Sequence, residues 1–214
     1  GKLENLSEKL QNMSFEGYGL AIGHTRWATH GKPTECNAHP HSGTQSAIIH
    51  NGIIENYKEL KEELQAKGVC FQSQTDTEVI VHLFESYTQT QEAFEATIKR
   101  LQGSFAILLI TKLDSNRIFY AKKHSPLLIG FNKNNPNEVF FASSDAALIG
   151  LIDSVIYLDD GDFGSISIDE IGGLKYEIKP FNANKEKAQK DGYRYFMEKE
   201  IYEKAFCLRQ WWGE

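Results

Sequence analysis

The sequence has few cysteines, no long apolar run and no excess of basic residues. The cysteines, at positions 36, 70 and 207, have unrelated spacings, which argues against a disulfide framework and predicts reduced thiols in a cytoplasmic protein. The longest apolar run, Phe105–Ile110, is far shorter than the roughly 20 residues of a membrane-spanning helix, so we expect no membrane contact. The formal net charge is −6, and we expect no nucleic-acid partner, because phosphate binding requires a basic patch.

The chain has enough apolar residues to bury a full core. Of its 214 residues, 41% are hydrophobic and 12% are aromatic, which suits one large domain or one domain with a tail. Apolar periodicity predicts four helices. The first covers residues 1–13, and the second runs from Ile53 to Gly68, which is a stop signal. The third begins at Asp76 after a capping box at Thr75–Glu78, and the fourth runs from Thr90 to Leu101.

Short apolar runs between turn signals predict strands, and most of them follow Gly103. They are expected at 17–22, 47–50, 69–73, 104–112, 117–122, 126–131, 138–142, 154–158, 162–168 and 174–179, with a short helix capped by Ser143–Asp145 and running through Ile149. Short links imply antiparallel pairing. Helices early in the chain and strands late predict an α+β domain, not alternating βαβ units.

Most of the candidate functional residues lie between His24 and Asn56. This stretch contains the segments HTRWATHG (24–31), NAHPH (37–41) and HNGIIEN (50–56), and it holds five of the seven histidines. A segment so rich in polar donors, and interrupted by Gly and Pro, is a poor core element. It is typical of binding loops on a rigid scaffold.

The histidines and Asp76 each admit two interpretations. Cys36, His39, His41 and His50 are side chains that zinc accepts, but their spacing matches no closed four-ligand pattern, so hydrogen-bonded polar groups inside a loop scaffold are favoured. Asp76, as the first residue inside a helix, would complement the positive end of the helix dipole. Alternatively, its carboxylate would hold the ammonium group of a substrate.

Two further groups point to a small zwitterionic ligand. Arg26, next to Trp27, can bind a carboxylate through two parallel N–H donors. Asn51-Gly52 after a strand is either a turn or a pair of N–H donors, one from a side-chain amide and one from the backbone, that can form an oxyanion hole. Together with Asp76, these groups fit an amino acid that carries an acyl group to be attacked.

The motifs HTRWATHG, NAHPH, HNGIIENY and QTDTE, in this order, closely resemble the glutaminase domain of the glutamine:fructose-6-phosphate amidotransferase family. The resemblance continues through GSFAILLI, SPLLIG, FFASSDAALI, YLDDGDFGSI and YFMEKEIYE, and so covers nearly the whole chain. Related amidotransferases of purine and asparagine synthesis share the Asn-Gly pair. They are not expected to show RWATHG followed by NAHPH.

The resemblance implies a fold and a set of roles. The fold is a four-layer α/β/β/α sandwich of antiparallel sheets, like that of the N-terminal-nucleophile hydrolases, here lacking its first strand or strands. By the same resemblance, Arg26 binds the α-carboxylate of L-glutamine and Asp76 its α-ammonium group, while Asn51 and Gly52 form the oxyanion hole. The pocket is lined by Trp27, Thr29 and His30.

The resemblance also implies partners. Glutamine is hydrolysed to glutamate and ammonia without a cofactor or metal, and the ammonia passes to sugar-isomerase domains that convert fructose 6-phosphate to glucosamine 6-phosphate. The full-length enzyme is expected to be a homodimer. Within this chain we expect residues 1–184 to form the glutaminase domain. Residues 185–214 read as a linker toward the isomerase domains, with an atypical tail from residue 204.

The family's nucleophile, an N-terminal cysteine, has no counterpart in these residues, because the chain begins with Gly1 at a point beyond it. Cys36 is a poor substitute, since it is internal and lacks a free α-amino base. We therefore expect residues 1–214 alone not to hydrolyse glutamine. The alternatives are a glutamine-binding module without turnover and a metal-dependent hydrolase that uses His39, His41 and His50.

Overall fold

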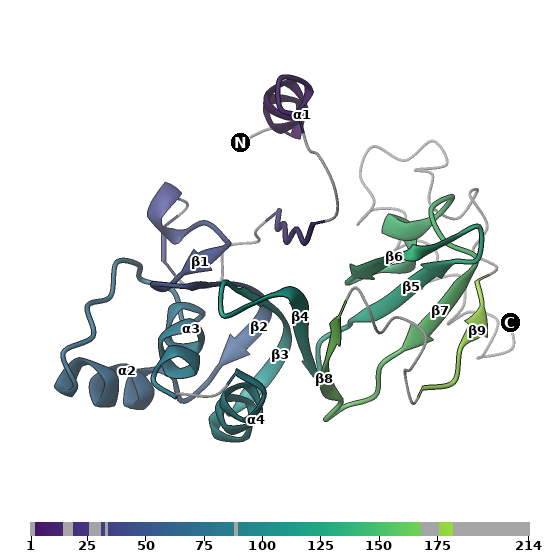
Figure 1. Cartoon of the computed structure of the whole chain (residues 1–214). Coiled ribbons are helices and arrows are strands. Elements are labelled where there is room, and N and C mark those ends of the chain that lie inside the picture. Colours follow the sequence, from purple (N-terminus) through teal and green to yellow (C-terminus); the bar gives the residue numbers. More distant parts are fainter. Residues whose placement is uncertain are drawn as a thin grey trace, which may run out of the picture.

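Two antiparallel sheets and a layer of helices make up the computed structural model, which describes residues 3–14, 19–25, 31–32, 34–87, 90–167 and 176–181 (Figure 1). The first sheet has the strand order β1-β2-β3-β4-β8, formed by His41–Ser42, Ser46–Ile54, Gly103–Thr111, Asp114–Lys123 and Phe163–Ser167. The second sheet has the order β6-β5-β7-β9, formed by Asn135–Ala142, Leu128–Asn132, Ser154–Tyr157 and Lys179–Pro180. The predicted α+β class with antiparallel pairing is confirmed.

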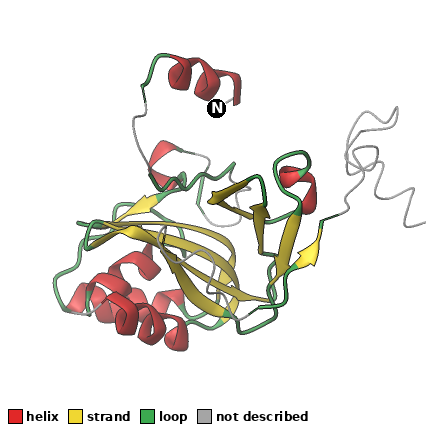
Figure 2. Cartoon of the chain, turned by 45° about the vertical axis from the view of Figure 1, so that its right-hand side comes forward, coloured by secondary structure: helices red, strands yellow, loops and turns green. Residues whose placement is uncertain are grey.

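Helices cover one face of the first sheet (Figure 2). These are α2 (Tyr57–Ala66), α3 (Glu78–Glu85) and α4 (Thr90–Arg100). Their apolar sides, including Leu64, Phe84 and Phe94, pack on the strand residues Ile107 and Phe119, and all five side chains are buried. Removing this apolar area from water supplies the main attraction between the layers.

The opposite face of the first sheet packs on the second sheet. Side chains alternate along each strand, so Leu108 and Tyr120 point away from the helices and contact Ile129 and Ile156 of the second sheet. The outer face of the second sheet carries Leu128 and Val155. Over these residues lies the 3₁₀ helix η2 (Asp145–Leu148), which contributes Leu148.

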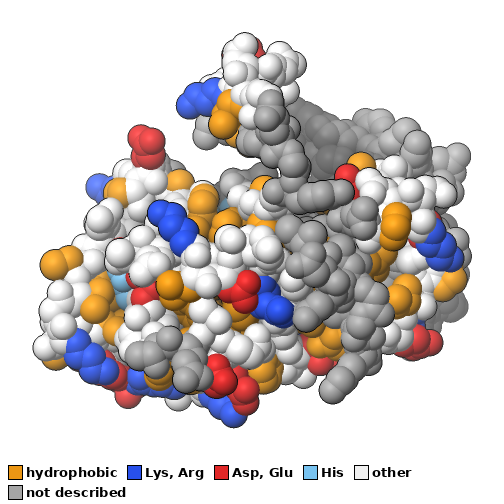
Figure 3. Space-filling model, in the orientation of Figure 1, with side chains coloured by type: hydrophobic (Ala, Val, Ile, Leu, Met, Phe, Trp, Pro, Cys, Tyr) orange, Lys and Arg blue, Asp and Glu red, His pale blue; other side chains and the backbone are white. Residues whose placement is uncertain are grey.

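Helix α1 (Leu3–Gln11) stands apart from the sheets, and the side chains described for residues 4–14 are exposed (Figure 1). Within the described part of the chain, no helix has both the length and the apolar character needed to cross a bilayer. On the face shown in Figure 3, Lys, Arg, Asp and Glu side chains are scattered among apolar ones.

The ends of two helices agree with their sequence signals. Helix α2 ends before Gly68, which has φ +86°, and the N–H groups of Gly68 and Val69 donate to the carbonyls of Gln65 and Leu64. This is the Schellman arrangement expected of a C′ glycine. Helix α4 begins at Thr90, as predicted.

Four predictions about elements were wrong. Ile53 and Ile54 belong to β2, not to a helix, because they pair with Ser104 and Gly103 of β3. The strands expected at 69–73 and, in its described part, at 17–22 do not form. The capping box at Thr75–Glu78 does not form either, because α3 begins at Glu78 and its N-cap residue makes no side-chain capping bond.

Candidate active site

The candidate site is built on the middle of β2. Asn51 and Gly52 lie within this strand, not after it, and they pair with Ala106 and Phe105 of β3. Gly52 has φ +127°, and a Cβ at this position would collide with the backbone of Ser104. Only glycine fits both constraints, so the close approach of β2 and β3 explains why the strand carries glycine here.

The segment that precedes α3 lies beside β2. Asp76 is buried, with 3% of its surface exposed, and its Oδ2 accepts a hydrogen bond of 2.8 Å from the backbone N–H of Ile54. The interpretation of Asp76 as the first residue of the helix was wrong, because the helix begins two residues later. Its carboxylate instead ties this segment to the end of β2.

The hydroxyl groups of the residues before and after Asp76 bind histidines, which explains why helix α3 has no side-chain cap at its N-terminus. Thr77 Oγ1 lies 3.1 Å from His39 Nε2 and 3.0 Å from His50 Nδ1. Thr75 Oγ1 lies 3.0 Å from His41 Nε2. A hydroxyl engaged with an imidazole is not available to cap a helix N-terminus.

The carboxylate of Glu78 also has a role other than capping. It accepts hydrogen bonds from the backbone N–H groups of Gln72 and Ser73 at 2.8 and 2.7 Å. Burial alone would raise the pKa of Glu78, but hydrogen bonds from His82, Gln72 and Ser73 outweigh it and lower the pKa to about 2. These bonds also explain why 69–73 is not a strand, since two of its backbone donors bind a side chain.

Hydrogen bonds hold the segments NAHPH and QTDTE together along their length. Asn37 accepts a hydrogen bond of 2.8 Å from the backbone N–H of Gln74 and donates to the Gln74 side chain at 3.3 Å. With the His39–Thr77 and His41–Thr75 contacts, this brings three of the predicted motifs together around Asp76 and β2.

His24 connects the remaining motif to the others. Its Nε2 lies 2.6 Å from Asn51 Oδ1, and its Nδ1 lies 3.0 Å from His39 Nδ1. His24, Thr75 and Thr77 were not predicted to be site residues. The only signal was the density of histidines, because a Thr-Asp-Thr segment before a helix also fits a simple cap.

The other predicted site residues, Arg26, Trp27, Thr29 and His30, lie outside the described residues. Within the described part of the chain, the cysteines are Cys36 and Cys70, which are exposed and form no disulfide with each other. Neither of them hydrogen-bonds to Asn51, Gly52 or Asp76.

The pKa of His50 is also strongly perturbed. Burial lowers its pKa to about 4, while the negative charge of Asp76 opposes that shift. The imidazole is therefore neutral near pH 7. Across the residues that the structure describes, no group of three His, Cys, Asp or Glu side chains is arranged to hold a metal ion. The ring nitrogens of His39, His41 and His50 bind threonine hydroxyls, as hydrogen-bonded polar groups would.

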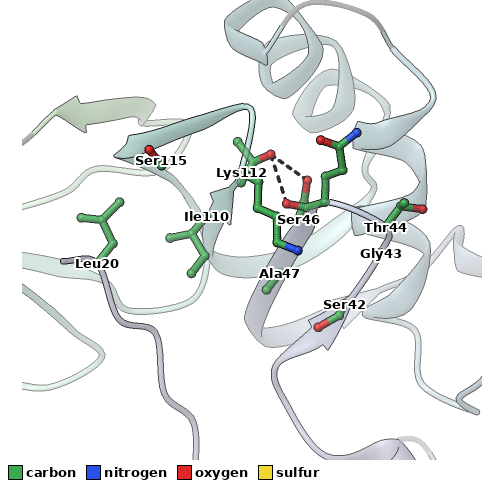
Figure 4. A pocket seen from close by; sticks show the side chains of 11 residues that line it. Leu20, Ser42, Gly43, Thr44, Ser46, Ala47, Ile110, Lys112 and Ser115 are labelled. Atoms are coloured by element: carbon green, nitrogen blue, oxygen red, sulfur yellow. Dashed lines mark hydrogen bonds between the residues drawn. The ribbon is translucent and has the colours of Figure 1, made fainter. Parts of the chain in front are cut away.

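A separate cavity of about 320 Å³ opens at the other end of β2 (Figure 4). Leu20, Ala47 and Ile110 line it on the apolar side, and Ser46 donates a hydrogen bond of 3.1 Å to Thr111 on the polar side. Of the predicted site residues that the structure describes, Asn51, Gly52 and Asp76, none lines this cavity.

Comparison with known proteins identifies the class. A family model described as "Glutamine amidotransferase domain" matches residues 24–150. The chain therefore belongs to the glutamine amidotransferase family, whose members are enzymes. The solved structure of an allosteric regulatory enzyme of purine biosynthesis is 25% identical, with a TM-score of 0.52, over 68% of this chain and 34% of that one. The glutamine phosphoribosylpyrophosphate amidotransferase of B. subtilis is 24% identical, with a TM-score of 0.50 and the same coverage, and supports the fold.

More similar relatives narrow the class further. The glutamine–fructose-6-phosphate aminotransferase (isomerizing) of Campylobacter jejuni is 55% identical over 98% of this chain and 36% of that protein. The protein of the same name from Helicobacter pylori is 45% identical over 97% of this chain and 35% of its own length. The chain thus spans about a third of the length of these relatives.

Proposed function

We propose that this chain is the glutaminase domain of a glutamine:fructose-6-phosphate aminotransferase, which releases ammonia from L-glutamine for the synthesis of glucosamine 6-phosphate. The observation that carries the proposal is the 55% identity to the Campylobacter jejuni protein along nearly the whole chain. The convergence of Asn51, Gly52 and Asp76 in one place supports it, because these groups suit the acyl and ammonium parts of glutamine.

In this proposal, the residues of β2 hold the reacting amide. The Asn51 side-chain N–H and the Gly52 backbone N–H form the oxyanion hole. Asp76 binds the α-ammonium group of glutamine and Arg26 its α-carboxylate, a pairing of opposite charges at both ends of the zwitterion. Trp27, Thr29 and His30 line the pocket.

The proposed reaction proceeds through a thioester. The thiol of an N-terminal cysteine, with its own α-amino group as base, adds to the side-chain carbonyl of glutamine and places negative charge on the oxygen. That charge is stabilised by Asn51 and Gly52. The C–N bond then breaks, the transferred proton leaves with the nitrogen as ammonia, and water hydrolyses the thioester to glutamate.

We also propose a domain organisation for the whole enzyme. Residues 1–184 are the glutaminase domain, and residues 185–214 are the linker, with the atypical segment from residue 204, toward sugar-isomerase domains that bind fructose 6-phosphate. The whole enzyme is a cytoplasmic homodimer. We further propose that residues 1–214 by themselves bind glutamine without turnover.

Calorimetry and a glutamate assay test this proposal together. We expect the isolated polypeptide 1–214 to bind L-glutamine without releasing glutamate, whereas the complete natural gene product, whose N-terminal residue is identified by sequencing, releases it. Glutamate release by the isolated polypeptide would show that another group acts as the nucleophile. A complete product without glutaminase activity would contradict the proposed function.

Asp76→Asn tests the assigned role of the buried carboxylate. The asparagine oxygen can still accept the Ile54 N–H, so we expect the fold to persist while glutamine affinity falls roughly 10- to 100-fold, the usual effect of losing one charge-assisted hydrogen bond. Asp114→Asn on β4, which removes the same charge from an ion pair with Arg117, is the matched control and should leave the affinity unchanged. Equal affinities for wild type and Asp76→Asn would refute the assignment.

A further inference from the structure

A continuous series of hydrogen bonds extends from Asn51 to the interior. It passes from Asn51 Oδ1 to His24 Nε2 (2.6 Å), from His24 Nδ1 to His39 Nδ1 (3.0 Å), from His39 Nε2 to Thr77 Oγ1 (3.1 Å), and from Thr77 Oγ1 to His50 Nδ1 (3.0 Å). Its far end, His50 Nε2, lies 3.5 Å from the carbonyl oxygen of Ser104. Asn51 is exposed and His50 is buried, so the series connects the surface of the site to the core.

The positions of the protons in this series follow from Asn51. An amide oxygen only accepts, so His24 Nε2 carries the hydrogen, and His24 Nδ1 then accepts from His39 Nδ1. His39 Nε2 in turn accepts from the hydroxyl of Thr77. That hydroxyl accepts from His50 Nδ1–H.

Asn51 Oδ1 and the Ser104 carbonyl both only accept, so a series of neutral groups can supply a proton to only one end, and the opposite order would leave the shorter contact, at Asn51, without one. It would place a lone pair of His24 Nε2 2.6 Å from Asn51 Oδ1, and only a turned-over carboxamide would relieve the repulsion. The chosen order leaves just the 3.5 Å contact with Ser104 without a proton, and this is the longest contact of the series. A neutral His50 is consistent with this order, because burial lowers its pKa to about 4.

The contact with His24 determines which end of the Asn51 side chain is presented outward. The oxygen is held by His24, so the NH₂ group faces away from it. Within the described part of the chain, that NH₂ group has no hydrogen-bond partner. A donor without a partner in an exposed position is available to a bound ligand.

We propose that His24 is a positioning residue for the glutaminase reaction: it holds the Asn51 carboxamide with its NH₂ group toward the oxyanion, in an orientation fixed through His39, Thr77 and His50. The inference rests on the proposed role of Asn51 in the oxyanion hole. A carboxamide free to turn over would present its oxygen to the developing negative charge and repel it. The His24 contact therefore stabilises the transition state without touching it.

Two substitutions of His24 in the complete gene product separate positioning from folding. In His24→Gln, the side-chain nitrogen can still donate to Asn51 Oδ1, so kcat should stay within about 3-fold of wild type. In His24→Leu, the donor is lost at similar volume, and kcat should fall roughly 10- to 100-fold with KM for glutamine little changed. His124→Asn, an exposed histidine that contacts Asp160, is the control and should match wild type.

A double-mutant cycle tests whether His24 acts through Asn51. In an Asn51→Ala background, His24→Leu should cause no further loss of kcat, because the group it orients is gone. An equal loss in both backgrounds, or a His24→Leu enzyme as active as wild type, would overturn the positioning role while leaving the proposed function intact. A wild-type enzyme that releases no glutamate would remove the proposed function and this inference with it.

Discussion

Two independent constraints require a glycine at position 52: its backbone conformation and the closeness of the Ser104 backbone. Its φ of +127° is outside the region that other residues adopt readily, and the backbone of Ser104 occupies the space of a side chain. Gly103 on β3 has φ +112° and faces the carbonyl of Ile53 in the same way. A glycine on each strand therefore allows β2 and β3 to approach each other closely at the candidate oxyanion hole.

Gly52→Ala should reveal both constraints. We expect the free energy of unfolding to fall by roughly 2–4 kcal/mol, because the new methyl group adds a backbone collision to conformational strain. Gly68→Ala is the matched control, since Gly68 has φ +86° but nothing within 4 Å of the added atom, and it should cost only about 1 kcal/mol. Urea denaturation measures both values, and equal losses would mean that the contact with Ser104 contributes nothing.

At the scale of elements, the start of α3 depends on the charge of Glu78. This carboxylate is buried and hydrogen-bonded to Gln72 and Ser73, and its pKa in the folded chain is about 2, against 4.5 for an unperturbed glutamate. A lowered pKa means that the ionised form stabilises the fold. The contribution is fully present above pH 4.5 and is lost as the pH falls toward 2.

Urea unfolding of wild type and Glu78→Gln at several pH values measures this contribution. Wild type should be the more stable at pH 6, by up to about 3 kcal/mol, and the difference should shrink steadily below pH 4.5 as wild-type Glu78 takes up its proton. A difference that stays constant between pH 6 and pH 3 would contradict the proposed link between this charge and stability.

Elements whose signals are local were predictable from the sequence, and those decided by distant partners were not. Gly68 ends α2 because its own conformation requires it, and the strands after Gly103 alternate in a pattern that their neighbours reinforce. Ile53 and Ile54 fit a helical face equally well, and pairing with β3 decided in favour of a strand. Thr75 and Glu78 have the spacing of a capping box, but Thr75 binds His41, which is 34 residues away, and Glu78 binds the backbone N–H groups of Gln72 and Ser73.

For the candidate site, the residue types and motifs were predictable from the sequence, but the contacts between distant residues were not. Asn51, Gly52 and Asp76 were identified by residue type and motif, and the structure brings the segments that carry them together. The histidine contacts were not predicted, because a hydrogen bond between residues 27 positions apart, such as His24 and Asn51, leaves no periodic trace in a sequence.

At the scale of the whole molecule, α1 contributes little to the described core. Leu6 and Leu10 of α1 are 53% and 44% exposed, and Met13 just after the helix is 56% exposed, so the apolar side of this helix is not buried against the sheets. An amphipathic helix that buries no apolar face gains little stability from the rest of a fold.

Deletion of residues 1–14 should therefore leave the free energy of unfolding within about 0.5 kcal/mol of the parent chain, as measured by urea denaturation. Leu64→Ala on α2, which removes a fully buried side chain, is the comparison and should cost roughly 2–5 kcal/mol. A loss of more than 1 kcal/mol on deletion would mean that α1 packs on the body of the protein.

The position of Asn51 and Gly52 inside a paired strand has a dynamic consequence. β2 and β3 remain paired on both sides of these residues, from Ser46 with Thr111 to Ile54 with Gly103. The backbone amide protons of β2 that donate to β3 should exchange with solvent only when the two strands separate, an event close to global unfolding in cost. This wall of the site is therefore in place before any ligand arrives, and no entropy of binding is lost in ordering it.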